Sequence, residues 1–111
     1  MLTGAHGSRP LELAARSEIG AGPVQRAENQ DNFLVIDGAG RASWLAGGLP
    51  QSRQVDGWPP GQLRLAVMDG MGGHGHGREA AEGVAAGLLA IPACADVDSL
   101  TRHLGRLHAQ L

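Results

Sequence analysis

The chain has 111 residues, a formal net charge of −2 and a single cysteine, Cys94. This length bounds it to one small domain, and the near-neutral charge excludes the basic surface typical of proteins that bind nucleic acid. One cysteine cannot form an internal disulfide, and no apolar run nears the roughly 20 residues that span a bilayer. The composition therefore predicts a cytoplasmic protein with no membrane segment.

The first part of the chain predicts strands separated by glycine-rich turns. Residues 1–10 are expected to be a disordered lead-in, and residues 11–19 alternate apolar and polar side chains as half-buried strands do. Residues 33–36 form a continuous apolar run, which is typical of a strand buried on both faces. The range 37–62 is rich in glycine and proline and predicts a long hairpin or a loop insertion. A further strand is expected over residues 63–68.

Helical spacing of apolar residues dominates after Gly77 and predicts a helix that Pro92 ends. Gly83 and Gly87 lie one turn apart on this helix and would let a neighbouring backbone come close. A second helix is expected to begin at Asp98, acting as the N-cap. The apolar stripe of that helix consists of Leu100, Leu104, Leu107 and Leu111.

The glycine-dense loop between the last strand and the first helix has three interpretations. In the first, Gly70, Gly72 and Gly75 match the G-x-G-x-x-G fingerprint of dinucleotide-binding folds. Asp69, directly before the first glycine, would place a negative charge beside the pyrophosphate. The acid expected about 20 residues later at a strand end would be Asp96, which follows a helix instead.

The other two interpretations are metal sites. His74 and His76 alternate in the loop and could converge on a transition metal, although a structural site normally needs about four ligands. Asp69 at a strand end and the unobstructed carbonyl of Gly70 instead offer two hard oxygen ligands at adjacent positions. Oxygen ligands of this kind favour magnesium or manganese.

Two motifs together resemble a known family. The stretch "RAENQD" at residues 26–31 is followed by "NFLV", and "LAVMDGMGGHGHGREAA" follows at residues 65–81. They resemble the paired N-terminal motifs of the metal-dependent protein serine/threonine phosphatases, the PPM or PP2C family, and most closely those of its bacterial branch. The resemblance implies an α+β fold, the N-terminal part of an α-β-β-α sandwich in which helices flank two antiparallel sheets.

The same resemblance implies roles for five residues. Asp69 would bridge two Mn²⁺ or Mg²⁺ ions, Gly70 would lend its carbonyl to one of them, and Asp31 would order a metal ion or its water. Arg26 would bind the substrate phosphate, and His74 matches the histidine of the bacterial motif and is a candidate for a part in the chemistry. A water activated by the ions would attack phosphorus without a phosphoenzyme. Phosphoserine and phosphothreonine proteins, the products of an opposing kinase, are the implied substrates.

The chain also departs from the family pattern. Gln30 stands where many relatives have glutamate, so a neutral amide would play any water-ordering role there. Met71 stands where the eukaryotic branch has histidine, so no general acid is assigned. The later D-G and D-N motifs that supply further metal ligands do not occur. Residues 11–111 are therefore expected to form a truncated phosphatase domain that is inactive in isolation. The alternatives are a short non-catalytic regulatory or binding module and a dinucleotide-binding fragment.

Overall fold

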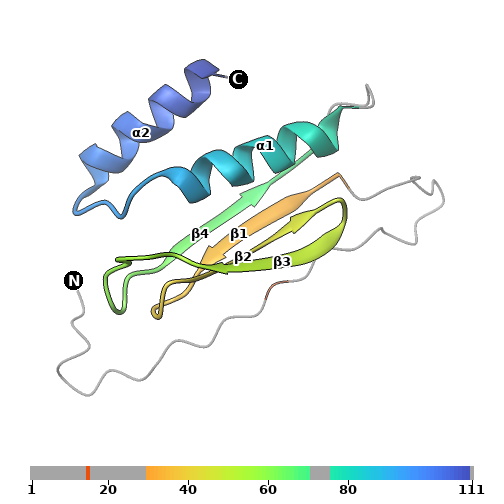
Figure 1. Cartoon of the computed structure of the whole chain (residues 1–111). Helices are drawn as coiled ribbons and strands as arrows, with labels where there is room; N and C mark the ends of the chain where they lie inside the picture. The colour runs from red at the N-terminus through yellow and green to blue at the C-terminus, as the bar shows by residue number, and fades with distance from the viewer. Residues whose placement is uncertain (1–14, 16–29, 71–75, 111) are drawn as a thin grey trace.

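The computed structural model describes residues 15, 30–70 and 76–110 (Figure 1). These residues form one antiparallel sheet of strand order β3-β2-β1-β4 and two helices, which confirms the α+β class. The elements are β1 (Asn32–Ile36), β2 (Arg41–Ala46), β3 (Leu49–Gln54), β4 (Arg64–Met68), α1 (Gly77–Ala90) and α2 (Val97–Gln110). The lead-in predicted at 1–10 and, apart from residue 15, the strand predicted at 11–19 lie outside the described residues.

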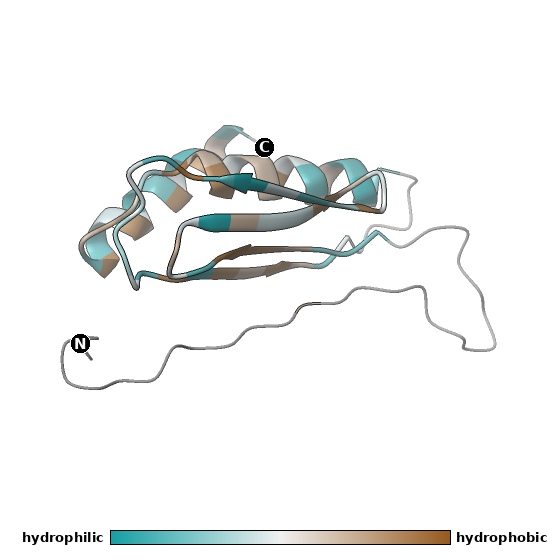
Figure 2. Ribbon diagram, turned by 60° about the horizontal axis from the view of Figure 1, so that its bottom comes forward, coloured by the Kyte–Doolittle hydropathy of each residue, from teal (hydrophilic) through white to brown (hydrophobic). Residues whose placement is uncertain are grey.

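The helices form two successive layers on one face of the sheet. Helix α1 packs on β1, β2 and β4, and α2 packs on α1 (Figure 1). Figure 2 shows hydrophilic and hydrophobic bands along the helices, as expected where one face of a helix is apolar. The core lies between α1 and the sheet and consists of Leu34, Ile36, Ala42, Trp58, Met68, Ala81, Ala85, Leu88 and Ile91. Among the described residues, no helix combines the length and apolar composition needed to cross a membrane.

Strand β1 is fully buried on the face toward α1 and half-buried on the other, so among the described residues the expected burial on both faces is only partly seen. Leu34 and Ile36 are fully buried, and they alternate with Phe33 and Val35, which are half-buried. The reason is that α1 covers a single face of the sheet. Val67, which pairs with Phe33, lies on the opposite face and is 87% exposed.

The range 37–62 contains the hairpin of β2 and β3, and both strands belong to the same sheet as β1 and β4. Gly47 and Gly48 connect the two strands, with φ angles of 59° and 76°. Two consecutive positive φ angles are required by the two-residue turn that matches the twist of a hairpin, and glycine adopts them without strain. The "AGGL" sequence is therefore a turn signal.

The boundaries of the helices follow local signals. Helix α1 ends at Ala90, shortly before Pro92, as predicted. Asp98 was predicted to be the N-cap of α2, and this was wrong by two residues. The Oδ1 atom of Asp96 accepts a hydrogen bond from the backbone N–H of Ser99 at 2.7 Å, so Asp96 is the cap and Asp98 lies in the first turn.

The apolar stripe of α2 is only partly covered. Leu100 and Leu107 pack against the core, whereas Leu104 is 40% exposed. A Cβ atom at Gly87 would overlap the Leu107 side chain, so close approach does occur there, through a side chain of α2. At Gly83 nothing lies within 4 Å of that position, and the predicted close approach was wrong. The last leucine of the stripe lies outside the described residues.

Arg64 joins the first residue of β4 to the C-terminal end of α1. Its guanidinium lies over the Trp58 ring, 5.0 Å from the centroid. It donates hydrogen bonds to the carbonyl oxygens of Leu88 at 2.9 Å, Ile91 at 2.5 Å and Pro92 at 2.8 Å. Burial lowers the pKa of Arg64, and the charge interaction with Cys94 opposes that shift. A cation at this place satisfies carbonyls that the end of a helix leaves without partners.

Asn32 is a buried polar residue that links β1 to β2. It is 3% exposed, and its side-chain amide donates to the Leu45 carbonyl at 2.8 Å. Its Oδ1 atom accepts from the N–H groups of Leu45 at 3.0 Å and Phe33 at 2.8 Å. One side chain therefore satisfies three backbone groups.

We expect Asn32→Ala to lower the free energy of unfolding by about 2 kcal/mol, because it leaves backbone groups without partners at a buried position. Urea denaturation followed by tryptophan fluorescence measures the change. Ser52→Ala, on the exposed edge strand β3, is the control and should change stability by less than about 0.5 kcal/mol. Equal stability of the two variants would mean that water replaces the lost bonds.

Candidate functional site

The two motif segments meet at one end of the sheet. Asp31 directly precedes β1, and Asp69 directly follows β4. These strands are antiparallel neighbours, with Asn32 opposite Met68, so the beginning of one lies beside the end of the other. The backbone N–H of Gly70 donates a hydrogen bond to Oδ1 of Asp31 at 3.0 Å, across 39 positions of sequence.

Gly70 is enclosed by the segment before β1 and by the start of α1. A Cβ atom at Gly70 would overlap the Gln30 carbonyl oxygen and lie 2.7 Å from the Gln30 Cβ atom. A Cβ atom at Gly77 would overlap the Gly70 carbonyl oxygen and lie 2.6 Å from Oε1 of Gln30. Both glycines are buried. The first residue of α1 therefore packs directly on the backbone that follows Asp69.

The carboxylates at this end of the sheet are accessible to solvent. Asp31 and Asp69 are both exposed, although Gly70 between them is buried. Two carboxylates and the Gly70 carbonyl are a set of hard oxygen donors, which fits magnesium or manganese. A carboxylate has about four acceptor positions, and the bond from Gly70 occupies one on Asp31.

The donor set is only part of a coordination sphere. Within residues 15, 30–70 and 76–110, no three histidine, cysteine, aspartate or glutamate side chains gather closely enough to hold a metal ion. Magnesium keeps several waters when protein ligands are few, so a single ion is compatible with this set. Two ions would need donors beyond it. Arg26 and His74, the other predicted site residues, lie outside the described residues.

The geometry also bears on the other two interpretations of the glycine loop. In the described part of the chain, α1 leads into α2 and the neighbour of β4 is antiparallel, so these residues form no parallel β-α-β unit of the kind that binds dinucleotides. Asp96, the acid that the fingerprint would need, caps α2. His76 lies exposed at the start of α1, while its predicted companion His74 and the fingerprint glycines Gly72 and Gly75 lie outside the described residues.

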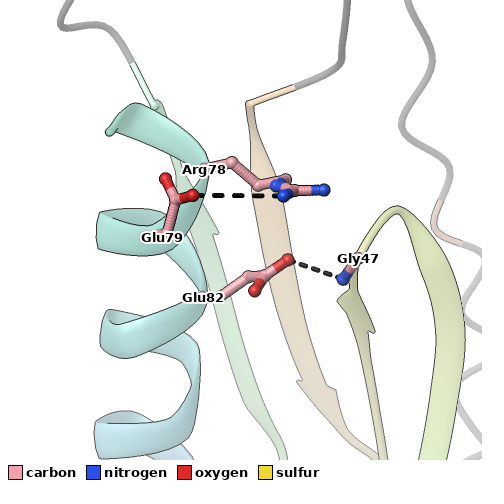
Figure 3. Close-up of polar contacts among 4 residues, drawn as sticks. All are labelled: Gly47, Arg78, Glu79 and Glu82. Carbon is pink, nitrogen blue, oxygen red and sulfur yellow. Dashed lines mark hydrogen bonds and ion pairs between the residues drawn. The ribbon is translucent and has the colours of Figure 1, made fainter. Parts of the chain in front are cut away.

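The first turns of α1 make polar contacts next to this end of the sheet (Figure 3). Arg78 Nη2 and Glu79 Oε1 lie 4.0 Å apart. Glu82 Oε1 accepts a hydrogen bond from the Gly47 N–H at 2.6 Å, which ties the tip of the β2–β3 hairpin to α1. The sequence shows Glu82 as one of several helical acids and gives no sign of this partner, since the two residues are 35 positions apart.

No family model, curated protein or solved structure matches this chain. The site is therefore interpreted from its own donors and from the two motifs that the sheet brings together.

Proposed function

We propose that Asp69, Gly70 and Asp31 contribute to a manganese or magnesium centre that hydrolyses phosphoserine and phosphothreonine in proteins. The observation that carries the proposal is the hydrogen bond from the Gly70 N–H to the Asp31 carboxylate. This bond joins the two segments in which the sequence resembles PPM phosphatases. It holds the Asp31 carboxylate close to Gly70, whose backbone carbonyl is the other proposed donor beside Asp69. Antiparallel pairing of β1 with β4 places both motif segments at the same end of the sheet.

In this proposal each group of the chain has its own role. Asp69 would be a shared carboxylate ligand of the ions, with Gly70 and Asp31 as further oxygen donors, and the ions when bound would supply an activated water and neutralise phosphate charge. Arg26 binds the phosphate, for which its planar fork of donors is suited. His74 is a candidate for proton transfer to the leaving group.

We further propose that the domain is an α-β-β-α sandwich. The support comes from the face of the sheet opposite α1, where Leu65 is 56% and Val67 is 87% exposed. Large apolar side chains on a sheet are normally covered by a second layer. A second sheet on this face would provide that layer and complete the sandwich.

The alternative is a non-catalytic binding module built on the same fold. Two-metal hydrolysis holds its ions roughly 3.5 to 4 Å apart, and the three donors found in the described part of the chain cannot by themselves hold two ions against water. We therefore expect the 111-residue chain alone to bind Mn²⁺ weakly and to show no turnover. The reading frame after Leu111 separates the alternatives, because the enzyme requires further D-G and D-N motifs there.

The protein expressed from its complete reading frame should hydrolyse p-nitrophenyl phosphate and phosphothreonine peptides only with Mn²⁺ or Mg²⁺. Chelation should remove the activity, and added Mn²⁺ should restore it, because oxygen donors bind these ions reversibly. Initial rates across a metal titration measure the dependence. Activity that survived chelation would contradict the proposed centre, and a complete protein without activity would favour the binding module.

A further inference from the structure

We propose that Gly77 is a positioning residue that fixes the place of the Gly70 peptide and its carbonyl oxygen. The inference rests on the proposed function in one respect, namely that the Gly70 carbonyl is a metal ligand. The contact itself is independent of that function. A Cβ atom at Gly77 would overlap the Gly70 carbonyl oxygen, so any other side chain at this position must displace it.

Gly70 has no space to move without disturbing its other partners. On one side, its Cα packs on the Gln30 backbone, where an added Cβ would lie 2.7 Å from the carbonyl carbon. Its N–H is held by Asp31 at 3.0 Å. Gly77 packs against the carbonyl side. Gly70 is therefore enclosed by the segment before β1 and by the first residue of α1. A displacement of its carbonyl oxygen would also shift its N–H and weaken the hydrogen bond to Asp31.

Glycine is needed at position 77 because a side chain would overlap the Gly70 carbonyl oxygen, and backbone conformation is not the reason. Gly77 does not have a positive φ angle, and it is the first residue of a regular helix. Alanine is a better helix former than glycine, so a purely local account predicts that Gly77→Ala stabilises α1. The Gly70 carbonyl and Oε1 of Gln30, the latter 2.6 Å from the added Cβ, are the features that oppose this change.

The same helix offers a matched control. At Gly83 an added Cβ would meet nothing within 4 Å, and the residue is exposed. Gly83→Ala therefore makes the same chemical change in α1 without touching the site. Asp31→Ala is the opposite control, because it removes the acceptor of the Gly70 N–H directly.

The test is amide hydrogen exchange in the 111-residue chain, followed by NMR at low temperature. We expect the Gly70 amide to exchange about tenfold faster in Gly77→Ala and in Asp31→Ala, as loss of one hydrogen bond predicts, and to be unchanged in Gly83→Ala. The amide of Leu34 in the core should keep its protection in all of them. A purely structural role for Gly77 at the start of α1 would not single out Gly70.

Line broadening of the same amides by added Mn²⁺ tests the metal. In the unmodified chain, broadening should be strongest at Gly70 and its neighbours, and Gly77→Ala should need about tenfold more Mn²⁺ for the same effect. If no broadening appears at Gly70 but Gly77→Ala still speeds its exchange, the proposed function fails and the positioning contact stands. Unchanged exchange at Gly70 would overturn the inference. The inference would also be overturned if the Leu34 amide lost its protection from exchange in Gly77→Ala and kept it in Gly83→Ala. That result would mean that Gly77 is needed only for the stability of the fold.

Discussion

Asp69→Asn is expected to lower the affinity of the proposed centre for Mn²⁺ by more than about 100-fold and to abolish phosphatase activity. A carboxylate that bridges two ions supplies charge to both, and changes in residues that only support metal ligands already cost about 10- to 100-fold. Asparagine has nearly the same shape, and Asp69 is exposed, so the fold should be kept. Calorimetric titration with Mn²⁺ and initial rates with p-nitrophenyl phosphate, both on the protein from its complete reading frame, measure the loss.

Arg26→Ala provides the contrast for this experiment. If Arg26 binds the substrate phosphate and no metal ion, this variant should raise KM for a phosphoprotein and leave the affinity for Mn²⁺ close to normal. Near-normal turnover of Asp69→Asn at low Mn²⁺ would show that Asp69 only forms the turn after β4. The proposed centre would then have to be abandoned, whatever the effect of Arg26→Ala.

Arg64→Ala should lower the free energy of unfolding by about 3 kcal/mol. The guanidinium donates to three carbonyl oxygens at the end of α1 and lies over Trp58. Hydrogen bonds to charged groups contribute about 1.5 to 3 kcal/mol each. Because Arg64 is partly exposed to solvent, we take about 1 kcal/mol for each of its three bonds, which is below that range. Thermal unfolding followed by circular dichroism should show a fall in Tm of more than about 10 °C.

Arg53→Ala is the matched control for Arg64→Ala. Arg53 is exposed on the edge strand β3, so its removal should change stability by less than about 0.5 kcal/mol. Arg64→Lys should lower the free energy of unfolding by an amount between those of Arg64→Ala and Arg53→Ala. An ammonium group keeps the charge but cannot donate to three carbonyls with the geometry of a guanidinium. If Arg64→Ala were as stable as Arg53→Ala, solvent would be satisfying the end of α1 and the arginine would be dispensable.

Local patterns predicted most of the secondary structure. Pro92 marked the end of α1, and the run of apolar residues marked β1. The errors arose where the answer depends on distant parts of the chain or on two similar neighbours. Whether Phe33 and Val35 are buried depends on which face of the sheet α1 covers, and the strand's own sequence does not contain that information. For the start of α2, two aspartates two positions apart are both good caps, and the sequence does not choose between them.

The sequence suggested members of the candidate site but not the contacts between them. The motif resemblance singled out Asp31, Asp69 and Gly70, and antiparallel pairing of β1 with β4 brings them together. The packing of Gly77 on Gly70 had no sequence signal, because a glycine in a glycine-dense loop does not reveal what lies against it. Arg64 was missed for a related reason, since an arginine at a strand boundary resembles an ordinary surface charge.

The strand order has a consequence for the route by which the chain folds. The hairpin of β2 and β3 closes through two glycines, Gly47 and Gly48, whereas β1 can pair with β4 only after the chain between Ile36 and Arg64 has been looped back. Longer loops cost more chain entropy to close, and non-local pairing is slower than local pairing. During synthesis the ribosome also releases β1, β2 and β3 before β4. We therefore expect Asp31 to meet Gly70 late, after β1, β2 and β3 have paired, so that a nascent chain has most of its sheet before the two halves of the site come together.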